Sequence, residues 1–464
     1  VRPMSTGTAV VAGTAAAVCT AAAFRLCSGT DYVDGTSACW FNLEDAAGIP
    51  LTSSIHAIAL FETPPTTQGV EDLVRSLCRH RRFRQRLVRR RWLWHYWEDS
   101  PGFDPAQHLA ENPVQLGGQE LQERVSKLLT TGMDPTRPPW SATFYPNYSD
   151  EDGHKGAILF RLHHSMGDGF VWLQTFMREV VPTSSDAEVV PVLRGSKTAR
   201  PSLAAVALDA VSSTVRLVAS GDDAPGPLRA VRNVDPSSTV AARWCLAPTT
   251  VAQIKAFAKP LGLTVNDVLL GALGQALQRV VRRRREARSF ANPKTTVWVA
   301  LRPVPDAYKS EVPLVFSNGN LGACYMDLPV GEASTRDACM AVQSRVQKLK
   351  GTLEPVIGAY LLRVFGLLPP AISAKLLPVC AYNSTVSASS LPGPAFDFTL
   401  AGARARAAFF FVPCAGKFGA FVTIATVQGR VCFGVNTNTS VLDAAGAQEV
   451  CAEFAAALQE CCKE

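Results

Sequence analysis

The stretch His163-His-Ser-Met-Gly-Asp-Gly169 constrains the fold more than any other part of the chain. The apolar run 156–162 precedes it, and apolar positions recur at helical spacing from Phe170 to Val180. This pattern predicts a strand, a tight loop and a helix. The loop would present two imidazoles and a carboxylate, and Gly167 and Gly169 would let its backbone turn sharply and approach a ligand.

The residue types of this loop suit proton transfer. Histidine is the side chain best able to accept a proton near neutral pH, and a nearby carboxylate can orient its ring or shape the loop. Two other interpretations remain open from the residues alone. The histidine pair is equally consistent with buried structure at a strand end. A metal site of His163, His164 and Asp168 fits the ligand types, but no second cluster at ligand spacing supports it.

Length and composition favour a globular protein of two domains. A chain of 464 residues exceeds one ordinary core, and 47% hydrophobic with 18% charged residues excludes a disordered chain. The thirteen cysteines show no CxxC pair and no zinc-finger spacing, which indicates a reducing compartment.

The chain divides into four parts. Residues 1–38 are an Ala-rich segment in which 3–24 carry no charge; it is interpreted as a core-packed helix, a weak membrane anchor or a targeting remnant. A first domain spans 39–181, a Pro/Ser-rich crossover spans 182–240, and a second domain spans 241–464. Strands interspersed with helices in both domains predict an α/β architecture with two related sheets.

Three further stretches bear on partners. The helical pattern 70–91 carries eight arginines from Arg79 onward and is followed by Trp92, Trp94, Tyr96 and Trp97. This suits a membrane headgroup layer or a CoA phosphate, or else a solvated helix face beside a core strand; no nucleic-acid motif accompanies it. A second basic run, 282–285, is interpreted as a solvated loop. The helix predicted over 356–368 is apolar nearly all round. Our default interpretation places it in the core, and the alternatives are that it lines a lipid tunnel or lies on a membrane.

In this order, the stretches resemble the wax ester synthase/diacylglycerol acyltransferase family of the CoA-dependent acyltransferase superfamily, over roughly residues 39–460. The stretch 163–169 is similar to the family's HHxxxDG motif, which chloramphenicol acetyltransferase-like enzymes and condensation domains share. There are three departures: Ser390 replaces a usual Asn, Val299-Ala-Leu-Arg302 replaces a Val-Asn-Leu-Arg type sequence, and the stretch from Trp40 to Asp45 matches the family's opening stretch only loosely. Six other stretches carry the resemblance: 83–87, 103–108, 134–140, 264–268, 319–322 and 392–394.

The resemblance implies two chloramphenicol-acetyltransferase-like domains, each a mixed sheet flanked by helices, with an active-site tunnel at their interface. It implies transfer of a long-chain acyl group from acyl-CoA to a fatty alcohol or diacylglycerol, giving wax esters or triacylglycerol. No metal or cofactor would be needed, since acyl-CoA is a substrate. From the arginine- and tryptophan-rich stretch 79–97, we expect the protein to associate with a membrane or lipid-droplet surface on the cytosolic face, which in a eukaryote would be the endoplasmic reticulum or a lipid droplet.

The resemblance also assigns roles to the site residues. His164 would be the general base, and His163 would serve structure. Asp168 would fix the loop through a salt bridge to Arg302. Asn266 would either donate to the oxyanion or cap its helix, two roles that we weigh equally. Gly167, Gly169 and Asp267 would support the site.

Two alternatives remain at this point. One is another acyltransferase of the superfamily that uses a different alcohol. The other is a non-catalytic lipid-binding protein that keeps the fold.

Overall fold

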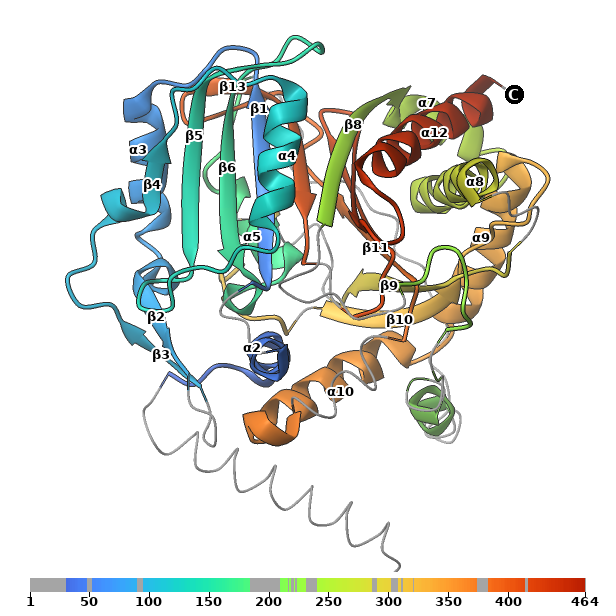
Figure 1. Ribbon diagram of the computed structural model, residues 1–464, viewed down its shortest axis with the longest axis horizontal. Helices are drawn as coiled ribbons and strands as arrows, with labels where there is room; N and C mark the ends of the chain where they lie inside the picture. Colours follow the sequence, from blue (N-terminus) through green and yellow to red (C-terminus); the bar gives the residue numbers. More distant parts are fainter. Residues whose placement is uncertain are drawn as a thin grey trace, which may run out of the picture.

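The computed structural model describes residues 31–47, 52–89, 95–183, 209–215, 217, 221, 223–230, 240–285, 290–301, 308–309, 312–319, 321–373, 383–413 and 416–463. These residues form two α/β halves that lie side by side, each built on a mixed β-sheet with helices packed against it (Figure 1). The uncharged segment 3–24, most of the crossover, Trp92, Trp94 and Arg302 lie outside the described residues.

The first half is built on a seven-stranded sheet in the order β4-β5-β6-β1-β13-β12-β7. At its centre, β1 is antiparallel to both β6 and β13. The strand bounds are β1 Ser54–Phe61, β4 Leu109–Glu111, β5 Trp140–Ser149, β6 Lys155–His163, β7 Val181–Pro182, β12 Phe398–Leu400 and β13 Ala403–Phe411. A small hairpin, β2 Gln85–Val88 with β3 Tyr96–Asp99, extends this half.

The helices of the first half contribute apolar side chains to the core of this half. In α3 (Thr67–Leu77), the apolar positions spaced at helical intervals are all buried, and Thr66 caps the first turn. In α5 (Gly169–Met177), Phe176 contacts the ring of Phe160 on β6 at a centroid distance of 5.1 Å. The remaining helices of this half are α2 (Gly35–Ala47) and α4 (Gly118–Leu128).

The second half is built on a six-stranded sheet in the order β10-β9-β11-β14-β15-β8. Its strands are β8 Val240–Thr250, β9 Lys294–Ala300, β10 Leu321–Asp327, β11 Val386–Pro392, β14 Ala420–Val427 and β15 Arg430–Asn438. Its helices are α7 Val251–Ala258, α8 Val265–Arg285, α9 Thr335–Lys350, α10 Glu354–Leu367 and α12 Ala444–Lys463. Helices α8, α9 and α12 share one apolar core with the sheet.

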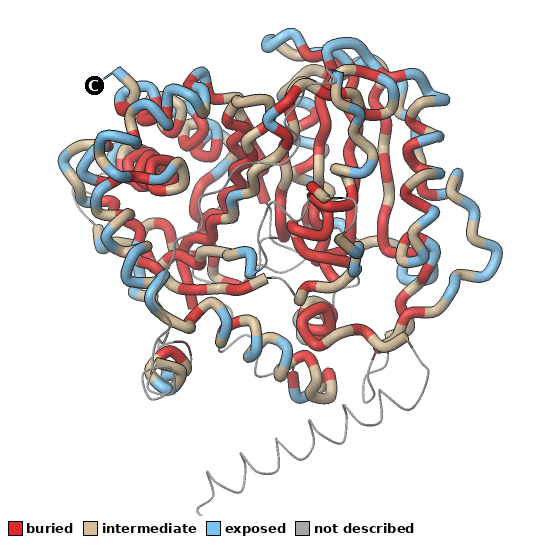
Figure 2. Tube along the Cα trace, turned by 180° about the vertical axis from the view of Figure 1, so that it is seen from behind, coloured by how far each residue is buried: buried red, intermediate tan, exposed pale blue. Residues whose placement is uncertain are grey.

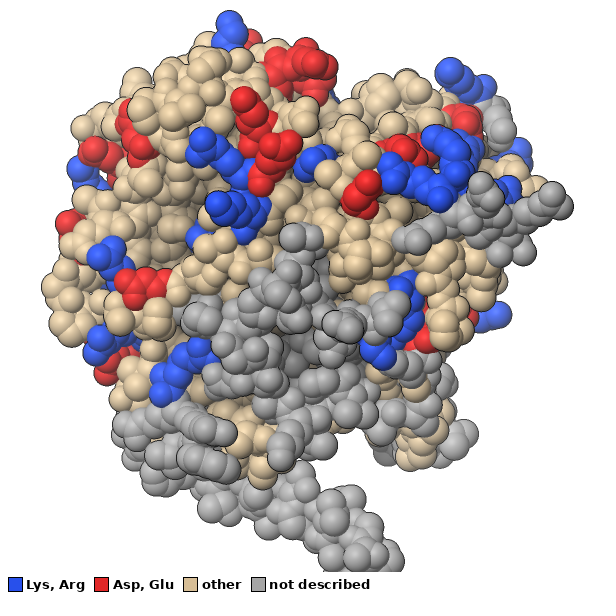
Figure 3. Space-filling view, viewed as in Figure 1, with Lys and Arg blue, Asp and Glu red and all other residues tan. Residues whose placement is uncertain are grey.

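The basic end of α8 differs from the predicted solvated loop. The arginines 279, 283 and 284 pair with acidic residues of α12, including Arg279 with Glu460 and Arg284 with Glu449. The basic run therefore joins two neighbouring helices. On the face shown in Figure 3, acidic and basic side chains are interspersed, and neither sign gathers into one broad patch.

The second half contributes two strands to the first sheet, which the predicted boundaries did not anticipate. The strands β12 and β13 come from the second domain as predicted (241–464), yet they lie in the first sheet. The edge of β13 docks on the second sheet, where Thr423 donates to the Phe410 carbonyl and Gln428 donates to the Ala405 carbonyl. Helix α2 begins at Gly35, inside the segment 1–38 that we separated from the first domain.

The helix predicted over 70–91 is wrong beyond Leu77. The chain forms a short 3-10 turn at Arg81–Arg84 and then strand β2. Three of its arginines bind the protein itself: Arg81 pairs with Asp99, Arg86 pairs with Glu98, and Arg82 pairs with Asp31. These partners, which the sequence places up to 51 residues away, hold the arginines in the local fold.

Burial follows the sheets. In Figure 2 the strands of both halves are mainly buried, whereas α10 at the lower edge of the molecule is largely intermediate or exposed. The helix packs through its glycines: a Cβ at Gly358 would lie 2.6 Å from the Ala323 carbonyl oxygen, and a Cβ at Gly366 would overlap the backbone of Gly35 in α2. Helix α10 is therefore not core, contrary to our default interpretation. Over the described residues, no helix is both long and apolar enough to cross a bilayer.

Candidate active site

The motif forms the predicted strand, loop and helix. Strand β6 ends at His163, a 3-10 turn spans His164–Met166, and α5 begins at Gly169. Asp168 caps α5 by accepting the Val171 N–H at 3.1 Å. Position 167 requires glycine because a Cβ there would lie 2.8 Å from a methyl carbon of Val171.

His163 has a structural set of contacts, in agreement with the role that the resemblance implies. Its ring is fully buried and stacks on Phe41 with centroids 4.7 Å apart. Nδ1 accepts the Ser165 N–H, so the other nitrogen, Nε2, faces Glu44 Oε1 at 3.0 Å as a donor. His163 thus ties the motif to α2.

His164 lies on the other side of the turn and lines a cavity. Its ring stacks on Trp40 with centroids 3.9 Å apart, and its Nδ1 lies 2.9 Å from Asn318 Oδ1. Burial lowers the pKa of His164 to about 4, although hydrogen bonds at its own carbonyl and at Asn318 act in the opposite direction. The imidazole is therefore neutral, and thus able to accept a proton, over the physiological pH range.

The cavity lies at the seam of the two halves and has a volume of about 280 Å³. Its lining is almost entirely apolar, and α5 contributes one wall while β1 and β13 contribute another. Lining residues include Ile55, Ala57, Ala59, Leu162, Phe170, Leu173, Phe176 and Met177 from the first half, and Trp298, Ser390, Leu391, Phe421 and Ala425 from the second. The site suits alkyl chains.

Two strands of the second sheet separate beside this cavity. Strand β11 pairs with β9 only over Val386–Ala388, whereas its pairing with β14 continues to Pro392. The segments beyond that point, 298–300 of β9 and 389–392 of β11, both line the cavity. A gap between separating strands presents backbone N–H and C=O groups to a ligand.

The structure separates the two roles that we weighed for Asn266. Helix α8 is capped by Thr264 and Asp267, which exchange hydrogen bonds in a reciprocal box. Asn266 instead accepts a hydrogen bond at Oδ1 from Ser390 Oγ, at 2.8 Å. Ser390 lines the cavity and Asn266 does not, so Asn266 lies one side chain behind the wall. Its donation to an oxyanion stays a prediction.

The remaining predicted site residues divide between two outcomes. Asp168 lines the cavity and is buried, with its capping role visible. Its salt bridge to Arg302 falls outside the described residues. A Cβ at Gly169 would meet no atom within 4 Å, so space does not require glycine there.

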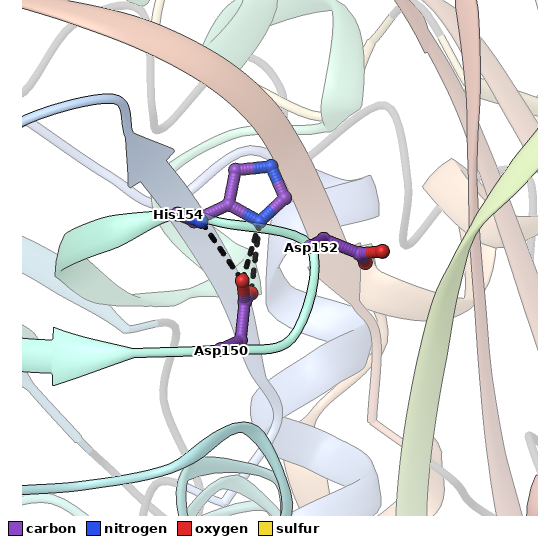
Figure 4. A group of neighbouring side chains, drawn as sticks. All are labelled: Asp150, Asp152 and His154. Carbon is purple, nitrogen blue, oxygen red and sulfur yellow. Dashed lines mark hydrogen bonds and ion pairs between the residues drawn. The ribbon is translucent and has the colours of Figure 1, made fainter.

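A second cluster of ionisable residues lies at the other end of β6, at the tip of the β5–β6 hairpin. Asp150, Asp152 and His154 are close enough to hold an ion, but Figure 4 shows Asp152 directed away from the other two. Asp150 accepts hydrogen bonds from the His154 ring, the His154 N–H and the Tyr148 hydroxyl. These bonds account for the cluster as a cap on the hairpin.

Comparison with known proteins identifies the family to which the chain belongs. The sequence profile of the wax ester synthase/diacylglycerol acyltransferase catalytic domain matches residues 53–269, and that of the WS/DGAT C-terminal domain matches 319–461. The chain belongs to this family. It is accordingly an acyltransferase. The predicted resemblance to the family is confirmed, because the two matched ranges include parts of both halves.

Two relatives of the family illustrate the range of sequence similarity. A probable diacylglycerol O-acyltransferase of Mycobacterium tuberculosis is 24% identical over 417 residues, which cover 85% of this chain and 88% of that protein. The wax ester synthase/diacylglycerol acyltransferase 5 of Arabidopsis thaliana is 24% identical over 61% of this chain and 63% of its own.

Solved structures confirm the predicted two-domain α/β fold. The WS/DGAT from Marinobacter aquaeolei VT8 superposes with a TM-score of 0.63 at 18% identity, covering 94% of this chain and 100% of that one. The first condensation domain of the calcium-dependent antibiotic synthetase gives a TM-score of 0.61 at 12% identity, over 94% and 97% of the chains. The chain thus shares its fold with both proteins.

Sequence reasoning missed three residues around His164: Trp40, Ser37 and Asn318. Trp40 and Ser37 come from α2, a stretch whose likeness to the family is loose. Asn318 lies 154 residues from His164 in the chain. No spacing rule connects them, because the fold alone brings these segments together.

Proposed function

We propose that this protein transfers a long-chain acyl group from acyl-CoA to the hydroxyl of a fatty alcohol or diacylglycerol, with His164 as general base. One observation carries the proposal: a neutral imidazole faces an apolar cavity at the seam of the halves. Its Nδ1 is engaged by Asn318, and among the described residues no partner of Nε2 is found. The free nitrogen is therefore the one that can accept a proton from a substrate.

The reaction needs no covalent enzyme intermediate. Nε2 removes the hydroxyl proton as the alcohol oxygen attacks the thioester carbonyl carbon. The tetrahedral intermediate then collapses, the carbon–sulfur bond breaks, and the CoA thiolate takes the proton from the imidazolium. A positioned base of this kind typically contributes ~10²–10⁴-fold, and alignment of the two substrates supplies much of the remainder.

The cavity supports a lipid substrate. Its wall follows α5 from Gly169 to Met177, which at 1.5 Å per residue is about 12 Å of apolar surface. Small residues, Ala57 and Ala59, leave room on the opposite wall. We infer that an alkyl chain lies there, and that the pantetheine arm of acyl-CoA reaches His164 through the gap between β9 and β11.

The oxyanion donor remains part of the proposal. If Asn266 donates to the oxyanion, replacing it by alanine should lower kcat by ~10²–10³-fold. A much smaller loss would leave Asn266 the role of holding Ser390 at the cavity wall. The variant Ser390→Ala serves as the comparison because it keeps the Asn266 amide while removing their mutual hydrogen bond and one hydroxyl of the cavity wall.

The direct test uses radiolabelled acyl-CoA with a panel of long-chain alcohols and diacylglycerol. Ester formation with a long-chain alcohol indicates wax synthesis, and formation with diacylglycerol indicates triacylglycerol synthesis. Product only with another alcohol supports a different acyltransferase. Bound lipid without any product supports a lipid-binding protein and contradicts the proposal.

We also propose that the protein associates with a membrane or lipid-droplet surface, on the cytosolic side, through α10. Val356 is 39% exposed, Tyr360 is 60% exposed, and Ile372 just beyond the helix is 49% exposed. Arg81, Arg82 and Arg86 are engaged in ion pairs within the protein, so the proposal rests on the apolar residues of α10.

Liposome flotation tests this association. Replacing Val356 and Tyr360 by aspartate should reduce flotation. Replacing the exposed Val114 of the first half should leave it unchanged. Equal flotation of the α10 variant and the wild type would contradict the proposal.

A further inference from the structure

A chain of hydrogen bonds links the ring of His164 to a carboxylate at the start of α2. His164 Nδ1 lies 2.9 Å from Asn318 Oδ1, and Asn318 Nδ2 lies 2.8 Å from Ser37 Oγ. Ser37 Oγ in turn lies 2.5 Å from Asp34 Oδ2. Asn318 Nδ2 also lies 2.7 Å from the carbonyl oxygen of His164. Three separate segments of the chain therefore meet at Asn318.

The chemistry of each partner fixes the direction of this chain. An ionised carboxylate only accepts, so the Ser37 hydroxyl donates to Asp34 and accepts from Asn318. The backbone carbonyl of His164 only accepts, so it also takes a hydrogen from the Asn318 amide nitrogen. The Ser37 hydroxyl and the His164 carbonyl therefore both require the amide nitrogen, Nδ2, to face them. The amide oxygen, Oδ1, then faces the imidazole. Because Oδ1 is an acceptor, the hydrogen between it and the ring belongs to Nδ1.

The arrangement is buried and well packed. Ser37 and Asn318 are fully buried, and Trp40 covers one face of the imidazole. Other catalytic histidines are oriented by a carboxylate bound directly to the ring. In this protein the ring meets a neutral amide, and the Asp34 carboxylate is linked to the ring through three successive hydrogen bonds.

We propose that Asn318, held in place by Ser37 and Asp34, is the positioning residue that keeps His164 in the Nδ1–H tautomer and leaves Nε2 free to accept the substrate proton. This inference rests on the proposed function, because it requires His164 to be the base. When the imidazole becomes charged, Oδ1 of Asn318 and the face of Trp40 both stabilise the cation without rearranging.

The test compares tautomer and turnover in four variants of the whole protein. Asn318→Leu removes the acceptor, Asn318→Asp keeps an acceptor oxygen, and Ser37→Ala removes only the support. Ser76→Ala is the matched control, since that hydroxyl also donates to a carboxylate, Glu179, but away from the site. Nitrogen-15 NMR of labelled histidine reports the tautomer, and the His164 signals are assigned by their loss in His164→Gln.

We expect His164 to be wholly Nδ1–H in the wild type, in Asn318→Asp and in Ser76→Ala. In Asn318→Leu the Nε2–H tautomer should appear, and kcat should fall about tenfold or more with little change in KM. Ser37→Ala should move both quantities in the same direction by a smaller factor, and it keeps the test available if Asn318→Leu fails to fold.

The inference is overturned if Asn318→Leu or Ser37→Ala folds and keeps a wholly Nδ1–H imidazole, or if kcat is unchanged. Failure of the proposed function gives a different result. In that case His164→Gln itself would retain turnover, whatever the tautomer in the other variants.

Discussion

The two ends of strand β6 each carry a buried histidine, and their environments differ. At the hairpin tip, His154 is bound to the carboxylate of Asp150 at 2.8 Å, and the Tyr148 hydroxyl completes the set. At the other end, His164 is bound to the amide of Asn318 and lines an apolar cavity. A histidine beside a carboxylate is here a structural cap. The histidine that has one ring nitrogen free and lines a cavity, His164, is the one that we propose as the general base.

The largest effect expected from this comparison is on turnover. His164→Ala should remove ~10²–10⁴-fold of the acyl-transfer rate while the protein remains folded, because the proton acceptor is lost. His154→Ala should leave kcat within a few-fold of the wild type. The rates are measured with labelled acyl-CoA and the folding by circular dichroism. Comparable losses in the two variants would remove the distinction between the two ends.

The pH dependence of activity sharpens the comparison. The pKa of His164 is lowered to about 4, mainly by burial, so the imidazole stays unprotonated until the pH falls to that value. The acidic limb of kcat/KM should therefore lie near pH 4 and well below the ordinary histidine value of 6.5. A limb between pH 6 and 7 would contradict a buried, neutral base.

The same shift affects stability. The unfolded chain binds a proton at His164 near pH 6.5, whereas the folded protein does so only near pH 4. Between these values the unfolded state holds more protons, so the free energy of unfolding falls as the pH is lowered through this window. His56, whose pKa is lowered by burial and by Arg161, acts in the same direction.

Replacing the carboxylate at the hairpin tip should affect stability only. Burial raises the pKa of Asp150, but hydrogen bonds from His154 and Tyr148 outweigh it and hold the pKa below its usual value. Asp150→Asn should lower the free energy of unfolding by about 1.5 kcal/mol through weaker charged hydrogen bonds. Denaturant titration measures the change, and kcat should be unaltered. A loss of kcat in the folded variant would give the tip a role in turnover.

The smallest expected effect concerns the helix cap at Asp168. Asp168→Ala should cost about 1 kcal/mol because the first turn of α5 loses its acceptor. Asp168→Asn keeps the cap and removes the charge, so its melting curve should stay close to that of the wild type. If both variants melt early, the charge matters as well, as the predicted salt bridge to Arg302 requires. An unaltered curve for Asp168→Ala would exclude a structural role.

Local features of the site could be predicted from the sequence, and long-range ones could not. The stretch 163–169 encodes its strand, turn and capped helix within a few residues, so its form was predicted correctly. Thr264 and Asp267 similarly encode the start of α8. By contrast, Asn318 reaches His164 only because the whole fold is in place. The hydrogen bonds from Thr423 and Gln428 to the backbone of β13 likewise cannot be predicted from any local sequence pattern.

The arginine-rich stretch shows the same limit from another direction. The spacing of its residues predicted a long helix. In the structure the stretch forms a turn and a strand, in which the arginines pair with Asp31, Glu98 and Asp99. These acidic residues lie outside the stretch 70–91, so an analysis of its helical periodicity does not detect them. The sequence therefore identified the charged region correctly, but the spacing of its residues predicted the wrong secondary structure.

The crossing of β13 has a consequence for any attempt to take this enzyme apart. A polypeptide that stops before residue 398 would lack β13, an interior strand of the first sheet. The remaining piece would carry β13 with only the short strand β12 beside it in that sheet. Proteolytic cleavage between the two halves should therefore leave a protein whose fragments elute together in size-exclusion chromatography. The two halves are interleaved parts of a single folding unit.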